Sequence, residues 1–288
     1  MRHPSATARL AALPMSPPQR PPRRDALIPL LVALLVLALL PATARAQTAE
    51  PTTLTLDLAG QRVAVDVYRP TTADGTPRGA VILSHGFTRS RTTMGGHAAA
   101  LAARGVLALT PDMPTTFDFH RNAQGLGELV AALRAGRTGA GPAVDRVVLV
   151  GFSAGALSSL LAANAPGVVG YVGLDAFDKV TDDQGLGLRF APQVTAEVVL
   201  LRAPPSRCNA ESVSAPWRLA VPRLRSDKVI ESASHCDFEA PSDWICHLAC
   251  GRADAGRQAE VRRVLVESVE RWMSAGTGAA AGTALQPP

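Results

Sequence analysis

The chain has 288 residues, of which 47% are hydrophobic and 18% are charged, and this composition excludes a disordered, highly charged chain. The formal net charge of +5 comes from the first 46 residues, which hold six arginines and one aspartate. In the rest of the chain 23 of the 29 Lys and Arg residues balance 23 of the 24 Asp and Glu residues. Nothing in this balance favours nucleic acid as a partner.

Residues 26–40 read ALIPLLVALLVLALL, follow a basic segment and precede the small-x-small site Ala44-Arg45-Ala46. This run is shorter than the about 20 residues of a membrane-spanning helix. It predicts a secretory signal peptide over residues 1–46, cleaved before Gln47, with an uncleaved anchor as the alternative. We therefore expect a secreted or periplasmic protein without stable membrane anchoring. The Arg23-Arg24 pair leaves both Sec and twin-arginine export open.

Residues 47–275 predict one domain, and the Ala/Gly/Thr-rich residues 276–288 predict a disordered tail. Apolar runs and period-two alternation predict strands at 53–58, 62–68, 80–83, 106–109, 146–150, 168–174, 197–201 and 228–231. Helical patterns cover 92–104, 125–134, 153–164 and 257–273. The first two strands read as a hairpin. The later alternation predicts an α/β fold with a mainly parallel central sheet and helices on both faces.

The segment 179–194 reads as a polar loop that is too short for a large cap domain. Ligands of parallel sheets bind beyond the carboxyl ends of the strands. The residues that directly follow each predicted strand are therefore the candidates for chemistry.

The strongest motif is Gly151-Phe152-Ser153-Ala154-Gly155, which stands between a predicted strand and a predicted helix. A G-x-S-x-G sequence in this setting is typical of a sharp turn that raises a serine hydroxyl above the sheet, at the positive end of a helix. The alternative is a helix N-cap serine flanked by chance glycines. We expect Ser153 to be a nucleophile.

The segment Ser84-His85-Gly86-Phe87 follows the predicted strand 80–83. In a hydrolase sheet this loop supplies one backbone N–H to an oxyanion. The Phe87 N–H is the candidate, with the Ala154 N–H as the second donor. His85 is expected to brace the loop.

A serine nucleophile needs an imidazole base and an acid that orients it, and in this architecture both follow the serine in the chain. Of the later histidines, His235 comes directly after the last predicted strand and is the candidate base. For the acid we expect Asp175, at the end of the strand 168–174, with Asp178 and Glu211 as alternatives.

These residues together resemble the α/β-hydrolase superfamily. Within it the chain looks like the chlorophyllase-like and polyester-hydrolase-like serine esterases, a group related to dienelactone hydrolase. Ser84-His85-Gly86-Phe87 carries part of this likeness. Asp175 and Asp178 match a Leu-Asp-Pro-Val-Asp run of chlorophyllases, and His235 with Asp237 matches their His-x-Asp. The resemblance implies Asp175 as acid and His235 as base.

The nucleophile turn departs from plant chlorophyllases, because it reads Gly-Phe-Ser-Ala-Gly where they have Gly-His-Ser-Arg-Gly. The resemblance therefore implies the catalytic scheme and an ester substrate, without naming the acyl or alcohol group.

The chain has an even number of cysteines, Cys208, Cys236, Cys246 and Cys250. In an exported protein this even number favours disulfides. Zinc binding is the alternative interpretation, and the lack of a CxxC pair speaks against it. Three pairings are possible. We expect Cys208 with Cys236, because both follow what should be neighbouring strands, which leaves Cys246 with Cys250.

The sequence thus predicts an exported serine hydrolase that cleaves small-molecule or polymeric carboxylic esters through an acyl-enzyme. It should need no metal or cofactor. The alternatives are a catalytically inactive binding module on the same fold, and an acyltransferase or peptidase that uses the same three residues. The sequence does not indicate an oligomeric state.

Overall fold

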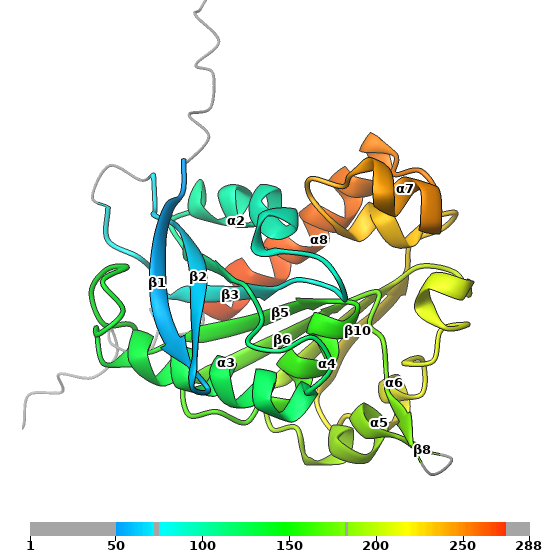
Figure 1. Cartoon of the computed structure of the whole chain (residues 1–288), viewed down its shortest axis with the longest axis horizontal. Helices are drawn as coiled ribbons and strands as arrows, with labels where there is room; N and C mark the ends of the chain where they lie inside the picture. Colours follow the sequence, from blue (N-terminus) through cyan, green and yellow to red (C-terminus); the bar gives the residue numbers. More distant parts are fainter. Residues whose placement is uncertain (1–49, 72–74, 182–183, 275–288) are drawn as a thin grey trace, which may run out of the picture. The chain divides into compact units, whose positions relative to one another are not determined.

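The structure is a computed structural model that describes residues 50–71, 75–181 and 184–274 (Figure 1). The chain divides into two units, Met1–Ala46 and Gln47–Pro288. The predicted signal peptide and the predicted tail 276–288 lie outside the described residues. Within the described part, no helix is both long and apolar enough to cross a membrane.

The second unit is built on one sheet with the strand order β1-β2-β4-β3-β5-β6-β9-β10. The strands are β1 (Thr52–Leu58), β2 (Gln61–Tyr68), β3 (Ala80–Ser84), β4 (Leu107–Pro111), β5 (Val147–Phe152), β6 (Val168–Leu174), β9 (Glu197–Arg202) and β10 (Leu224–Val229). β1 pairs antiparallel with β2, and β2 pairs antiparallel with β4. All other pairs are parallel, so β3, β5, β6 and β9 end at the same edge of the sheet.

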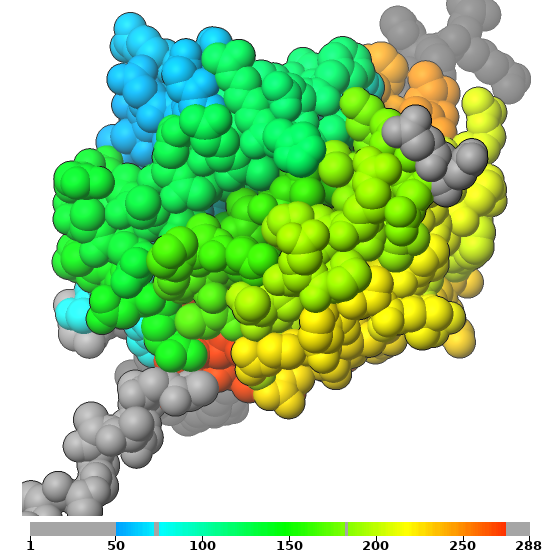
Figure 2. Space-filling model, turned by 90° about the horizontal axis from the view of Figure 1, so that it is seen from below, coloured from blue at the N-terminus to red at the C-terminus, as the bar shows by residue number. Residues whose placement is uncertain are grey.

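Helices cover both faces of the sheet. The helices are α2 (Gly95–Ala102), α3 (Phe119–Arg134), α4 (Ala154–Leu161), α5 (Leu186–Phe190), α6 (Trp217–Ala220), α7 (Trp244–Cys250) and α8 (Ala255–Ser274). Figure 1 shows α2 and α8 above the sheet and α3 and α4 below it. Figure 2 shows the lower face, where the green of α3 and α4 adjoins the yellow-green and yellow segments that include α5 and α6.

The alternation of side chains along β5 explains this layering. Val147 and Leu149 pack into the core beneath α3 and α4, whereas Val148 and Val150 pack into the core beneath α2 and α8. Successive side chains of a strand point to opposite faces, so a strand covered on both sides must be apolar throughout. The prediction of a mainly parallel sheet with helices on both faces is confirmed.

The prediction of a polar loop over 179–194 is wrong. This segment contains β7 (Val180–Thr181), β8 (Gln184–Gly185), α5 and a 3₁₀ helix η3 (Ala191–Gln193). Its order comes from buried tertiary contacts, because Gly187 packs against the buried ring of Trp217. These elements are short, and none of those described forms a large cap.

Two elements begin four or more residues before their predicted starts. The last strand, predicted at 228–231, is β10, which begins at Leu224 because its polar residues pair with the edge of β9. Helix α3 begins six residues before the predicted 125, since the side chain of Asp118 caps it by accepting a hydrogen bond from the Arg121 N–H.

Candidate active site

The residues singled out in the sequence meet at the edge where the parallel strands end. Ser153 follows β5, Asp175 follows β6, and the segment from His85 to Phe87 follows β3. His235 opens the 3₁₀ helix η5 (His235–Phe238), which comes after β10. The topology therefore brings together residues that lie up to about 150 positions apart in the sequence. They meet at the carboxyl ends of the parallel strands, where such sheets generally bind their ligands.

The turn at Ser153 is strained and tightly packed. Ser153 has φ 51° and ψ −118°, a conformation that costs free energy for any residue with a side chain. A methyl group added at Gly151 would lie 2.4 Å from Ala156 Cα, and one added at Gly155 would lie 2.3 Å from the His85 carbonyl oxygen. Both glycines are required by these close approaches, which hold the serine between strand and helix.

His235 and Asp175 are in direct contact. The Nδ1–H of His235 donates to Asp175 Oδ2 at 2.6 Å, and both side chains are buried. This contact fixes the proton on Nδ1 and leaves Nε2 as an acceptor. The Phe152 ring lies 4.6 Å from the imidazole, between centroids. Ser153 and His235 line the same hollow, which has a volume of about 210 Å³.

Asp175 is held by donors that the sequence did not reveal. Its Oδ1 accepts from the Ala203 N–H at 2.9 Å and from Asn209 Nδ2 at 3.2 Å. Asn209 is fully buried and also donates to the Pro204 carbonyl. It lies 34 residues after Asp175 and ends a 3₁₀ helix, η4 (Arg207–Asn209), so no local pattern links the two.

The other two carboxylates considered for the acid have different surroundings. Asp178 is buried and accepts from the backbone N–H groups of Gly187 and Leu188 and from Trp217 Nε1 at 2.7 Å. It therefore fixes α5 and α6. Glu211 is exposed and follows η4 in a turn with φ 56°. Asp175 is the carboxylate that the structure brings to His235.

The loop after β3 lies against Ser153. A methyl group added at Gly86 would be 3.2 Å from Ser153 Cβ, which places the backbone of Gly86 and Phe87 next to the serine. His85 braces this loop, since its Nδ1 contacts the Gly86 carbonyl at 2.8 Å and its Nε2 accepts from the Met113 N–H at 3.1 Å. Burial lowers the pKa of His85, and its accepting nitrogen likewise requires the neutral ring.

Asp237 holds the turn that contains His235 in place. Asp237 Oδ2 accepts from the Ser234 N–H at 2.7 Å and from Arg257 Nε at 2.8 Å, and Oδ1 accepts from the Asp254 N–H. The fully buried carboxylate thus ties η5 to the start of α8. The sequence marked Asp237 only as the partner of His235 in a His-x-Asp motif.

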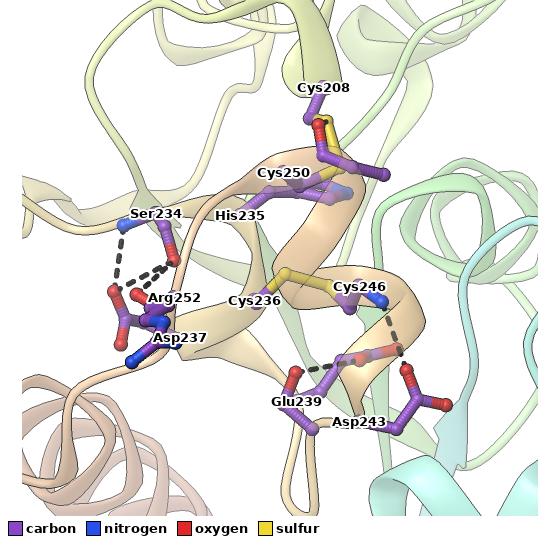
Figure 3. Close-up of a disulfide and its surroundings, with 12 residues drawn as sticks. Cys208, Ser234, His235, Cys236, Asp237, Glu239, Asp243, Cys246, Cys250 and Arg252 are labelled. Carbon is purple, nitrogen blue, oxygen red and sulfur yellow. Dashed lines mark hydrogen bonds between the residues drawn. A yellow bond between two sulfur atoms is a disulfide. The ribbon is translucent and has the colours of Figure 1, made fainter.

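The predicted cysteine pairing is wrong. The disulfides are Cys208–Cys250 and Cys236–Cys246, and both are visible in Figure 3. The expectation assumed that the loops after β9 and β10 meet directly. Instead α7 lies over both loops and presents Cys246 to the His235 turn and Cys250 to η4, one turn further along. The two disulfides line the hollow that holds Ser153 and His235.

No group of three or more His, Cys, Asp or Glu side chains is positioned to hold a metal ion in the described ranges 50–71, 75–181 and 184–274. The arrangement that these ranges do contain is a hydroxyl on a strained turn, an imidazole with a fixed tautomer and a buried carboxylate. Such a set can activate a serine for attack on a carbonyl carbon.

This sheet order, with a serine on the turn after β5, defines the α/β-hydrolase fold. Comparison with solved structures agrees. The dienelactone hydrolase from Anabaena variabilis ATCC 29413 superposes with a TM-score of 0.60 at 18% identity, over 78% of this chain and 99% of that one. The esterase domain of a Rhodothermus marinus protein gives 0.57 at 17% identity, over 78% and 99%.

A third structure, Est1E from Butyrivibrio proteoclasticus, has a TM-score of 0.56 at 15% identity, over 76% of this chain and 99% of its own. No family model and no curated protein matches the sequence. At these identities the comparisons show the fold, and the activity has to be argued from the site.

Proposed function

We propose that this protein is an exported serine hydrolase that cleaves carboxylic esters, with Ser153 as nucleophile, His235 as base and Asp175 as acid. One observation carries the proposal: His235 Nδ1 contacts Asp175 Oδ2 at 2.6 Å, while Ser153 and His235 face the same hollow. The sequence resemblance to chlorophyllase-like and polyester-hydrolase-like esterases supports the same chemistry.

In the proposed reaction, Ser153 Oγ forms a bond to the ester carbonyl carbon while its proton passes to His235 Nε2. Asp175 keeps the other ring proton on Nδ1 and stabilises the imidazolium. The N–H groups of Phe87 and Ala154 donate to the oxyanion, and each such donor contributes about 10²–10³ in rate. The alcohol leaves with the proton from His235. Water then attacks the acyl-enzyme while His235 takes its proton, and this step releases the acid and returns the proton to Ser153.

Export is proposed from the signal-peptide pattern of residues 1–46, with cleavage before Gln47. Two disulfides support it, because such bonds persist in oxidising compartments. N-terminal sequencing of the protein recovered outside the cytoplasm tests this part. A first residue of Gln47 supports cleavage, and a retained N-terminus supports the uncleaved anchor.

The catalytic assignment is tested with p-nitrophenyl butyrate and a fluorophosphonate probe. Ser153→Ala and His235→Ala should each lower kcat by about 10³-fold or more, and Asp175→Asn by about 10²-fold or more. Glu211→Gln, which alters the exposed alternative acid, should stay within about twofold. Only variants that retain Ser153 should be labelled.

Other outcomes point to the competing functions. If no adduct forms on Ser153 and no ester is cleaved, the protein is a binding module on a hydrolase fold. If an added alcohol captures most of the acyl group in place of water, it is an acyltransferase. Loss of activity in Glu211→Gln with full activity in Asp175→Asn would reassign the acid.

A further inference from the structure

Ser153 lies between two hollows of different character. One has a volume of about 430 Å³ and is lined by Phe87, Phe117, Phe119, Phe177 and Lys179. The other, of about 210 Å³, is the one that contains His235, together with Ile245 and Ala249. Both include Ser153 and Phe87 in their walls, so an ester bound at the serine can extend into both. His235 lines only the smaller of these two.

The larger hollow is walled by two aromatic pairs. The rings of Phe87 and Phe117 lie 5.1 Å apart between centroids, and those of Phe119 and Phe177 lie 6.3 Å apart. Phe87 is 44% exposed and Phe117 is 67% exposed, so apolar ring surface stays in contact with water. A planar apolar group placed there would remove that surface from water and make the offset or tilted contacts that aromatic rings favour.

The chemistry of the ester assigns each hollow to one half of the substrate. The leaving alcohol oxygen must take its proton from His235, so the alcohol has to lie on the imidazole side. The carbonyl carbon is bonded to Ser153 in the intermediate, and the acyl chain must leave it in another direction. The direction that avoids His235 leads into the hollow walled by phenylalanines.

We propose that the phenylalanine-lined hollow is an acyl subsite, and that the substrates are esters formed by small alcohols and carboxylic acids that carry an aromatic ring. The inference rests on the proposed function, since it uses the roles of Ser153 and His235. Hydrolysis breaks the bond between the carbonyl carbon and the alcohol oxygen. Ser153 gives its proton through His235 to the alcohol. Water then supplies the hydroxyl of the released acid, and the remaining proton of that water returns through His235 to Ser153.

Two isomeric esters test the proposal without changing size or hydrophobicity. Ethyl 3-phenylpropanoate carries the ring on the acyl side, and 3-phenylpropyl acetate carries it on the alcohol side. The kcat/KM of each ester is divided by its rate of alkaline hydrolysis, which removes the difference in intrinsic reactivity. The resulting ratio should favour the phenylpropanoate by about tenfold or more, as expected if the buried ring contributes about 1.4 kcal/mol or more. Ethyl propanoate, which lacks the ring, should also be slower by about tenfold or more.

Variants locate the preference in the hollow. Phe117→Ala and Phe177→Ala should each reduce the ratio between the isomers by about threefold or more, because each removes ring surface from the wall. Ile245→Ala, on the His235 side, should leave the preference for ethyl 3-phenylpropanoate over ethyl propanoate intact, because both esters have the same alcohol. Leu219→Ala is the matched control, since Leu219 is 78% exposed on α6 and lines neither hollow.

The possible failures are distinguishable. Turnover of both isomers at equal rates, or a preference for the acetate, overturns the acyl subsite while the esterase proposal stands. An isomer ratio that is unchanged in both phenylalanine variants also overturns it. If neither ester is cleaved and the fluorophosphonate does not label Ser153, the proposed function fails, and the subsite with it.

Discussion

The guanidinium of Arg89 and the carboxylate of Glu239 form a bidentate ion pair beside the candidate active site. Arg89 Nε donates to Oε1 at 2.6 Å, and Nη2 donates to Oε2 at 2.9 Å. Arg89 follows Phe87 by two residues, and Glu239 follows His235 by four. The pair therefore joins the loop with the proposed oxyanion donor to the loop with the proposed base, and so sets the spacing between them.

This ion pair should contribute strongly to stability. The Glu239 side chain is fully buried and that of Arg89 is 11% exposed, so Arg89→Ala leaves an uncompensated charge inside the protein. We expect a loss of about 3–5 kcal/mol in the free energy of unfolding, measured by urea denaturation. Burial already raises the pKa of Glu239, and Arg89 opposes that rise.

The matched control for this prediction is Arg263→Ala. Arg263 pairs with Glu267 at the surface of α8, where both side chains are more than half exposed. The expected change is below about 1 kcal/mol. Equal effects of the two alanine substitutions would show that the buried pair has no special role.

Asn209 should act as a positioning residue for Asp175. Asn209→Asp keeps the shape and the acceptor oxygen for the Ser206 N–H, but replaces the amide donor by a like charge beside Asp175. We expect kcat to fall by about tenfold or more with little change in KM, because the proposed acid is displaced. A purely structural role predicts lower stability in Asn209→Asp and Asn209→Ala with kcat unchanged in both.

The two disulfides should have separable effects. Cys208–Cys250 spans 42 residues and Cys236–Cys246 spans 10, so the chain-entropy model predicts losses of about 4 and about 3 kcal/mol on their removal. Removing Cys236–Cys246 by paired serine substitutions should lower kcat more, because Cys236 adjoins His235. Peptide mapping of the unreduced protein checks the pairing, and a peptide that joins Cys208 to Cys236 would contradict it.

Gly155 should not tolerate a side chain. A methyl group there would lie 2.3 Å from the His85 carbonyl oxygen and 2.5 Å from that of Ser84, which pushes the β3 loop away from the serine. We expect Gly155→Ala to lower kcat by about 10²-fold or more through loss of an oxyanion donor. Gly127→Ala on α3 is the control, with no neighbour within 4 Å, and should raise stability by about 0.5–1 kcal/mol.

Acid should weaken the attachment of the His235 loop through His97. His97 on α2 is fully buried, donates from Nε2 to the Phe238 carbonyl at 3.1 Å, and has no partner for Nδ1 among the described residues. Burial lowers its pKa from 6.5 to about 4, so the unfolded chain binds the proton more readily. The stability that depends on neutral His97 is complete above pH 6.5 and is lost as the pH falls towards 4.

His97→Gln provides the comparison, since its amide keeps a donor but does not titrate in this range. As the pH falls from 7 to 4.5, the urea midpoint of the wild type should decrease more than the midpoint of His97→Gln. A difference that is constant with pH would rule out His97 as the source of the acid sensitivity.

The sequence alone was sufficient where the physics is local. Gly151 and Gly155 around Ser153, placed between a buried strand and a helix, predicted the turn that the structure contains. Val168–Leu174 was predicted to the residue as β6, because a strand buried on both faces is apolar throughout. Only neighbouring residues and the period of the strand enter these predictions.

Tertiary structure decided the partners. The sequence favoured Asp175 as the acid but left Asp178 open as an alternative, and in the structure Asp175 contacts His235 whereas Asp178 contacts Trp217. The cysteine pairing depended on α7, which was not predicted, because its exposed Trp244, Ile245 and Leu248 give no buried periodicity. Contacts between distant segments follow from how the elements pack around the sheet, and a single sequence records the residues without that packing.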